Sequence, residues 1–138
     1  MTRDSDNDLS NGVKSHRKKK DFDERIKIIN KRYVDMYVSV HLNFLSDSRY
    51  SGPQVFFNKN NKEIADIIQK YINNKLGNNR DIKKIPGDTY MYNKLNNKGI
   101  LVECGFLSNS EERNKLISDK YQKEFAKILA DAIIYYYN

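Results

Sequence analysis

Residues 35–42 read Asp-Met-Tyr-Val-Ser-Val-His-Leu, and this stretch decides the fold class. Apolar side chains at every second position alternate with a mixed set that ends in His41, which is the period of a β-strand. Both faces of the stretch are fairly apolar before His41, and strands covered on both faces are typical of parallel α/β sheets. The sequence therefore predicts an α/β fold in which helices flank a mostly parallel sheet.

The rest of the chain supplies the other elements of such a fold. Its periodicities predict helices at Asp21–Arg32, Asn61–Leu76, from Asn109 or Ser110 to Ile117, and from Asp119 onward. They predict strands at Asp35–Leu42, Gln54–Asn58, Thr89–Tyr92 and Gly99–Cys104. Residues 1–20 are predicted to be a polar loop, and Asp21 is expected to cap the first helix. The order of elements indicates one α/β domain with a twisted sheet.

The last predicted helix ends in three consecutive tyrosines, residues 135–137. We expect these rings to pack within the fold and not to form a stacking platform. Cys104, the one cysteine, is expected to be a small buried residue and not a nucleophile.

Composition excludes several classes of protein and leaves one open. The 138-residue chain has a mean hydropathy of −0.83, and none of its apolar runs approaches the ~18 residues of a membrane span. A single cysteine rules out an intrachain disulfide and a thiolate metal cluster. The formal net charge of +7 favours a polyanionic partner, which includes nucleic acid, an anionic membrane and an acidic wall polymer.

Two polar residues stand out because each lies near the carboxyl end of a predicted strand. His41 ends one strand and Glu103 nearly ends another. Ligands of open α/β sheets bind outside those strand ends, imidazole is a common zinc ligand, and a carboxylate can act as a general base. Structural roles remain open on pattern alone: a hydrogen-bonded histidine at a strand end, and a carboxylate in an ion pair.

A family resemblance gives these two residues a role. Ser39-Val40-His41-Leu42-Asn43 and Val102-Glu103-Cys104-Gly105-Phe106-Leu107-Ser108-Asn109 resemble two signature motifs of the zinc-dependent N-acetylmuramoyl-L-alanine amidases of the bacterial cell wall. Met1-Thr2-Arg3-Asp4-Ser5-Asp6 resembles a third. Gly52-Pro53-Gln54-Val55-Phe56-Phe57 is similar to the branch found in spore-forming bacteria, which acts on the spore cortex.

The resemblance implies a reaction and a site. The reaction is hydrolysis of the amide between the lactyl group of N-acetylmuramic acid and L-alanine in peptidoglycan. His41 matches the last of three zinc ligands, and Glu103 matches the catalytic carboxylate that activates water. The other two ligands are expected upstream of Met1. Residues 1–138 would then be the C-terminal portion of a catalytic domain that lacks the family's first strand and helix, and this chain alone is expected to be inactive.

The resemblance also implies where the protein acts and with what. The substrate is peptidoglycan and not nucleic acid, the location is the cell wall or spore cortex, and an activating protein partner is left open. A different class of function competes with this one. In that alternative the chain is a non-catalytic basic module, with the cluster Arg17–Lys20 contacting a polyanion, or the remnant of a split gene.

Overall fold

The computed structural model describes residues 1–2, 5, 8–12, 15–31 and 33–138. The chain forms two compact units, one made of Met1–Tyr37 and Ile85–Lys98 and the other of Val38–Lys84 and Gly99–Asn138. Each unit is described separately below. No helix among the described residues has the length and apolarity needed to cross a membrane.

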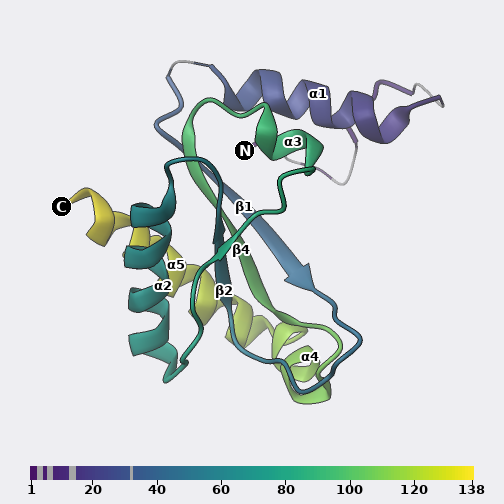
Figure 1. Ribbon diagram of the computed structural model, residues 1–138. Helices are drawn as coiled ribbons and strands as arrows, with labels where there is room; N and C mark the ends of the chain where they lie inside the picture. The colour runs from purple at the N-terminus through teal and green to yellow at the C-terminus, as the bar shows by residue number, and fades with distance from the viewer. Residues whose placement is uncertain (3–4, 6–7, 13–14, 32) are drawn as a thin grey trace. The chain divides into compact units, whose positions relative to one another are not determined.

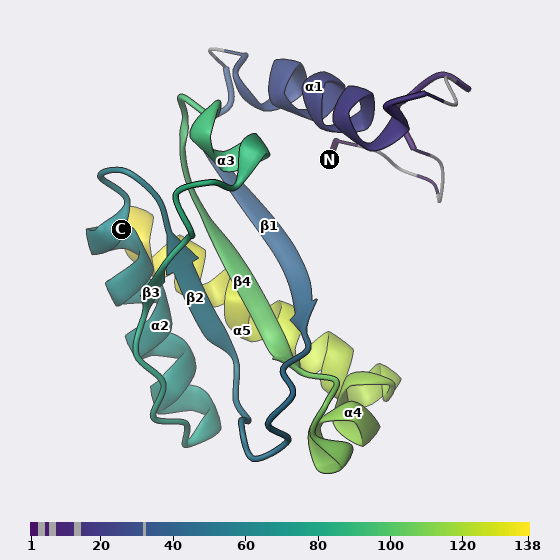
Figure 2. The same ribbon diagram turned by 45° about the vertical axis from the view of Figure 1, so that its right-hand side comes forward.

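The larger unit contains the sheet, whose strand order is β1-β4-β2-β3. The strands are β1 (Met36–Asn43), β2 (Gln54–Phe57), β3 (Lys83–Lys84) and β4 (Lys98–Phe106). Three helices accompany them: α2 (Lys62–Leu76), α4 (Ser110–Leu116) and α5 (Asp119–Tyr137). Figures 1 and 2 show α2 and α5 against the strands. The predicted α/β class, with helices flanking one sheet, is confirmed.

The direction of β2 differs from the expectation of a mostly parallel sheet. β1 and β4 run the same way (Figure 2), and β2 pairs with β3 in parallel, but β2 pairs with β4 antiparallel. The reason lies in the connection: ten residues without a helix join β1 to β2, and a parallel return needs a crossover of a dozen or more residues. The sheet is therefore mixed, with its antiparallel pair at the centre.

A continuous apolar core holds the helices to this sheet. Val55 and Val102 are register partners on β2 and β4, and both are fully buried. From α2 the stripe Ile64, Ile68 and Ile72 is buried, as the helical spacing predicted. The polar Gln69 is buried with them, because its Oε1 accepts the backbone N–H of Val55 at 2.7 Å and so satisfies the strand.

The C-terminal helix departs from expectation at its end. Phe125, Leu129 and Ala132 are buried as predicted, and Tyr136 is half-buried. Tyr135 and Tyr137, however, are 64% and 53% exposed, so the expectation that all three terminal tyrosines pack within the fold is wrong. Successive residues on a helix differ by about 100° in direction, and three in a row cannot share one buried face.

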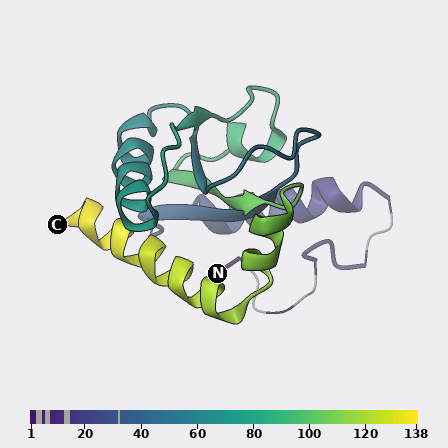
Figure 3. The same cartoon turned by 90° about the horizontal axis from the view of Figure 1, so that it is seen from below.

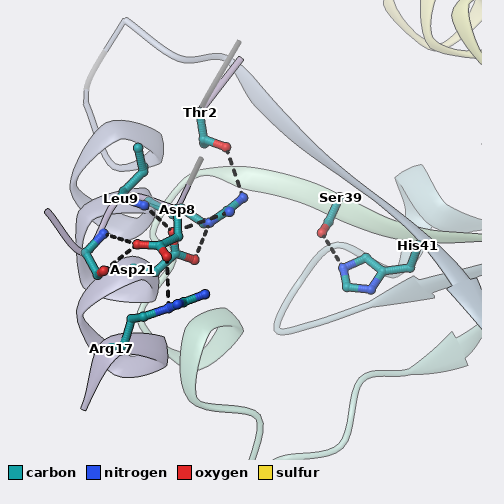
Figure 4. Close-up of polar contacts among 9 residues, drawn as sticks. Thr2, Asp8, Leu9, Arg17, Asp21, Ser39 and His41 are labelled. Atoms are coloured by element: carbon teal, nitrogen blue, oxygen red, sulfur yellow. Dashed lines mark hydrogen bonds and ion pairs between the residues drawn. The ribbon is translucent and has the colours of Figure 1, made fainter. Parts of the chain in front are cut away.

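The smaller unit contains α1 (Arg17–Ile29) and α3 (Tyr90–Asn93). α1 begins four residues earlier than predicted, so Arg17–Lys20 is helical and the polar loop ends at His16. Asp21 does not cap the helix; its carboxylate lies within it, accepts the Leu9 N–H at 2.7 Å and pairs with Arg25 at 2.8 Å (Figure 4). Thr89–Tyr92, predicted as a strand, instead caps and opens α3.

Asn30 connects the helix end of α1 to the segment after α3. Its amide donates to the Lys94 carbonyl and accepts from the Asn96 N–H, both at 2.8 Å. Tyr90 adds a second tie, since its hydroxyl donates to Asp23 at 2.6 Å. The predicted N-terminal motif is only partly visible in this unit, because Arg3, Asp4 and Asp6 lie outside the described residues.

Candidate active site

The structure places His41 on β1, two residues before that strand ends at Asn43. Its ring is exposed, and Nε2 lies 3.0 Å from the Ser39 hydroxyl oxygen (Figure 4). The Ser39 hydroxyl can donate to or accept from imidazole, so it holds the ring in one orientation. The sequence motif therefore corresponds to a histidine that is oriented locally and open to a ligand.

Glu103 lies on β4, the neighbour of β1 that runs in the same direction (Figure 1). Just beyond both strands the Leu107 N–H donates to the Asn43 carbonyl at 2.8 Å. The thiol of Cys104, next to Glu103, lies beside the backbone of His41. The fold thus brings the two predicted site residues to the same edge of the sheet, near the carboxyl ends of adjacent strands.

The Glu103 carboxyl is held in an unusual state for an acid. Its Oε2 is buried and has no hydrogen-bond partner. Burial raises the pKa of Glu103 above its usual value, because desolvation penalises the charged form. An ionised carboxylate in this position is a stronger base than one in water, which suits proton transfer.

Gln54 and Arg80 complete the surroundings of Glu103, and the sequence gave no sign of either. Gln54 is the register partner of Glu103, is buried, and donates to the Asp81 carbonyl at 2.6 Å. Its Oε1 accepts from Arg80 Nη2 at 2.7 Å. The Arg80 guanidinium lies 5.2 Å from the ring centre of Phe106, at the end of the same strand. Gln54 is thereby fixed beside Glu103.

A second carboxylate, Glu112, shapes the chain that follows Glu103. Its Oε2 accepts the Phe106 N–H at 2.8 Å, and its Oε1 accepts the Gly52 N–H at 2.7 Å. Gly105 has a φ of 155°, and a Cβ there would lie 3.0 Å from Glu112 Oε2, so only glycine lets the backbone approach this closely. Glu112 therefore joins the end of β4 to the loop that enters β2.

A polar pocket of about 240 Å³ opens beside this joint. Its lining includes Gly52, Asn78, Asn109, Glu112 and Tyr121. Burial raises the pKa of Tyr121 to about 12, so its phenol stays protonated.

The other candidates from the sequence have structural roles or lie elsewhere. Cys104 is buried, and burial raises the pKa of its thiol to about 11, which confirms the expectation that it is not a nucleophile. In the smaller unit the basic cluster Arg17–Lys20 is partly neutralised, because Arg17 pairs with Asp8 and Lys19 with Asp23, both at 2.9 Å.

No group of three or more His, Cys, Asp or Glu side chains among residues 1–2, 5, 8–12, 15–31 and 33–138 is arranged to hold a metal ion. Catalytic zinc sites use three protein ligands as a rule. His41 supplies one imidazole, so the described residues do not by themselves fit a zinc centre.

Comparison with known proteins identifies relatives along the whole chain. The family model described as N-acetylmuramoyl-L-alanine amidase matches residues 1–135. The germination-specific N-acetylmuramoyl-L-alanine amidase of Bacillus subtilis (strain 168) is 37% identical over 144 residues, which cover 99% of this chain and 60% of the relative. The chain therefore spans less than two thirds of that relative's length.

Solved structures agree with this assignment. The CwlD amidase of Clostridioides difficile, determined in complex with the GerS lipoprotein, superposes with a TM-score of 0.86 at 31% identity, over 98% of this chain and 73% of that one. The catalytic domain of CwlV, an N-acetylmuramoyl-L-alanine amidase of Bacillus (Paenibacillus) polymyxa var. colistinus, gives 0.72 at 25% identity, over 83% and 64%.

Proposed function

The chain belongs to the N-acetylmuramoyl-L-alanine amidase family, and from this premise we propose that it forms part of an enzyme that hydrolyses the lactyl–L-alanine amide of peptidoglycan. The observation that carries the proposal is the family match over residues 1–135, which includes a half-buried carboxyl, Glu103, at the site edge. The alternative of a non-catalytic basic module gives that carboxyl no task.

In the proposed reaction Glu103 is the general base. Its carboxylate takes a proton from water while the water oxygen bonds to the amide carbon. The C–N bond then breaks, and Glu103 returns the proton to the departing L-alanine amine, leaving a free lactyl carboxylate. A base whose pKa is raised by burial is well matched to this proton shuttle near neutral pH.

His41 is the proposed metal ligand. Zinc would polarise the amide carbonyl and the water. Because the described residues provide no three-ligand group, the proposed steps above use only Glu103, and further ligands would have to come from outside the described residues. The Ser39 hydroxyl, 3.0 Å from His41 Nε2, would then have to release that nitrogen or leave Nδ1 to bind the ion.

The relatives also favour a place and a partner. The B. subtilis relative is named germination-specific, and the C. difficile amidase was solved with a lipoprotein. We extend both to this chain: its peptidoglycan substrate is in the spore cortex, outside the cytoplasmic membrane, and a lipoprotein is a candidate for its activating partner.

A hybrid protein tests the proposal. The segment of the B. subtilis relative that this chain does not match would be joined to it, and release of amino groups from purified peptidoglycan would be measured. We expect activity that falls by about 10²–10⁴-fold in Glu103→Gln, the usual contribution of a general base, with zinc content unchanged. Activity that survives the substitution would remove Glu103 from the mechanism, and a folded but inactive hybrid would contradict the assignment.

A further inference from the structure

The outer side of α5, at its C-terminal end, carries exposed aromatic rings next to α2. Tyr135 and Tyr137 are 64% and 53% exposed. The ring centre of Tyr135 lies 5.6 Å from that of Tyr71 on α2. Figure 3 shows these two helices side by side near the C-terminus, and their contacts agree. We call Tyr71, Lys75, Tyr135 and Tyr137 the tyrosine surface.

Cationic side chains accompany these rings. Lys75 Nζ lies 5.4 Å above the centre of the Tyr71 ring. Lys127, one of the exposed residues of α5, is close enough to Tyr71 for the two groups to interact electrostatically, and it also pairs with Asp131 at 2.7 Å. The surface thus combines flat apolar rings, phenolic hydroxyls and ammonium groups, all within the larger unit.

This combination matches one kind of polymer. A sugar ring has an apolar C–H face and polar edges, and a tyrosine likewise has an apolar face and a polar tip. Amide hydrolysis at the lactyl group leaves a carboxylate on each muramic acid that has lost its peptide. The product is therefore a chain of sugar rings bearing regularly spaced negative charges, which complements tyrosines flanked by lysines.

We propose that the tyrosine surface binds glycan strands from which the stem peptides have been removed. The inference rests on the proposed function, since that reaction generates such strands. Binding the product strand away from the reacting edge would keep the enzyme on a polymer with many equivalent bonds. An effective local concentration of the next bond follows from such a second contact.

A binding experiment with the chain itself tests this inference. The probe is a set of fluorescently labelled, peptide-free glycan strands with free lactyl carboxylates, prepared with an unrelated amidase. We expect the double variant Tyr135→Ala/Tyr137→Ala to bind about tenfold more weakly, while Tyr135→Phe keeps most of the affinity because the ring remains. Tyr33→Ala is the matched control: Tyr33 is 72% exposed beneath Lys31 but lies in the other unit, and its loss should change nothing.

A second comparison isolates the charge. Lys75→Gln should weaken binding to the carboxylated strands and leave the weaker binding to chitin oligosaccharides, which lack carboxylates, unchanged. The inference is overturned if the double tyrosine variant binds the strands like the original chain, or if the tyrosines instead govern binding to anionic phospholipid vesicles or self-association. Because binding is measured without turnover, an inactive chain that still binds would contradict only the proposed function.

Discussion

Glu103 combines two properties that usually exclude each other, burial and an unpaired acceptor atom. A carboxylate without a donor reduces the stability of the folded state when it is ionised. Since burial raises its pKa, the folded chain takes up this proton at higher pH than the unfolded chain, and the penalty is relieved as pH falls. The side chain is held ready for proton transfer at a cost in stability.

We therefore predict that Glu103→Gln stabilises the folded chain at pH 7 by about 1 kcal/mol. The gain should shrink as pH falls through the raised pKa of Glu103, because the original side chain then becomes neutral as well. Urea unfolding of both proteins at several pH values between 4 and 8 measures this difference. A constant difference across that range would show that the buried charge is not its cause.

Glu112 has the opposite character, since both of its oxygens are occupied. Glu112→Ala would leave the buried amides of Gly52 and Phe106 without an acceptor, which should cost about 3 kcal/mol. Glu111 precedes it on the same helix turn but is exposed, so Glu111→Ala should cost less than about 0.5 kcal/mol. Urea unfolding of the two variants decides the matter; equal losses would mean that the two hydrogen bonds contribute nothing.

These residues also show what sequence can predict at this scale. His41 and Glu103 could be placed at strand ends because alternation along a single strand is a local pattern. Arg80 and Glu112 act on partners 26 and 60 residues away along the chain, on Gln54 and Gly52. Periodicity contains no information about such pairs, and both residues were without a predicted role at the site.

At the scale of elements, the start of α4 follows from one side chain. The Asn109 carbonyl oxygen Oδ1 accepts the N–H groups of Glu111 and Glu112 at 3.1 and 3.0 Å, so it caps the helix as the sequence predicted. Because this cap also directs Glu112 toward the end of β4, the short helix is part of the site's support.

We predict that Asn109→Ala destabilises the chain by about 1 kcal/mol, the usual value of an N-cap. Asn114 lies on the same helix, is exposed, and makes a matched control in which Asn114→Ala should be neutral or slightly stabilising through helix propensity. Thermal unfolding followed by circular dichroism compares the two. A loss equal in both variants would assign the effect to helix composition and not to the cap.

The elements that sequence misjudged share a physical reason. The early start of α1 depends on contacts outside the helix, such as Arg17 with Asp8, and β3 has only two residues, too few to show a period. The antiparallel direction of β2 is a property of the whole sheet, since β4 inserts between β1 and β2. Long helices such as α2 were predicted within a residue because their stripe repeats over several turns.

At the scale of the whole molecule, the chain spans 60% of the length of its B. subtilis relative, and its described residues provide one imidazole for a metal. Three ligands give zinc its high affinity, and a single histidine binds it weakly. We predict that the purified chain contains much less than one equivalent of zinc after dialysis and releases little amine from peptidoglycan, whereas the hybrid described above binds one equivalent.

Metal analysis of both proteins, with His41→Ala in each, measures this prediction. In the hybrid, His41→Ala should reduce zinc content severely, because one of its ligands is lost; in the chain alone it should change little, because no complete site exists to lose. His16, exposed in the smaller unit beside Ser15, provides the control, since His16→Ala should leave zinc unchanged in both proteins. Stoichiometric zinc in the chain alone would mean that residues other than those described complete the site around His41, and the expected inactivity of the chain would then be wrong.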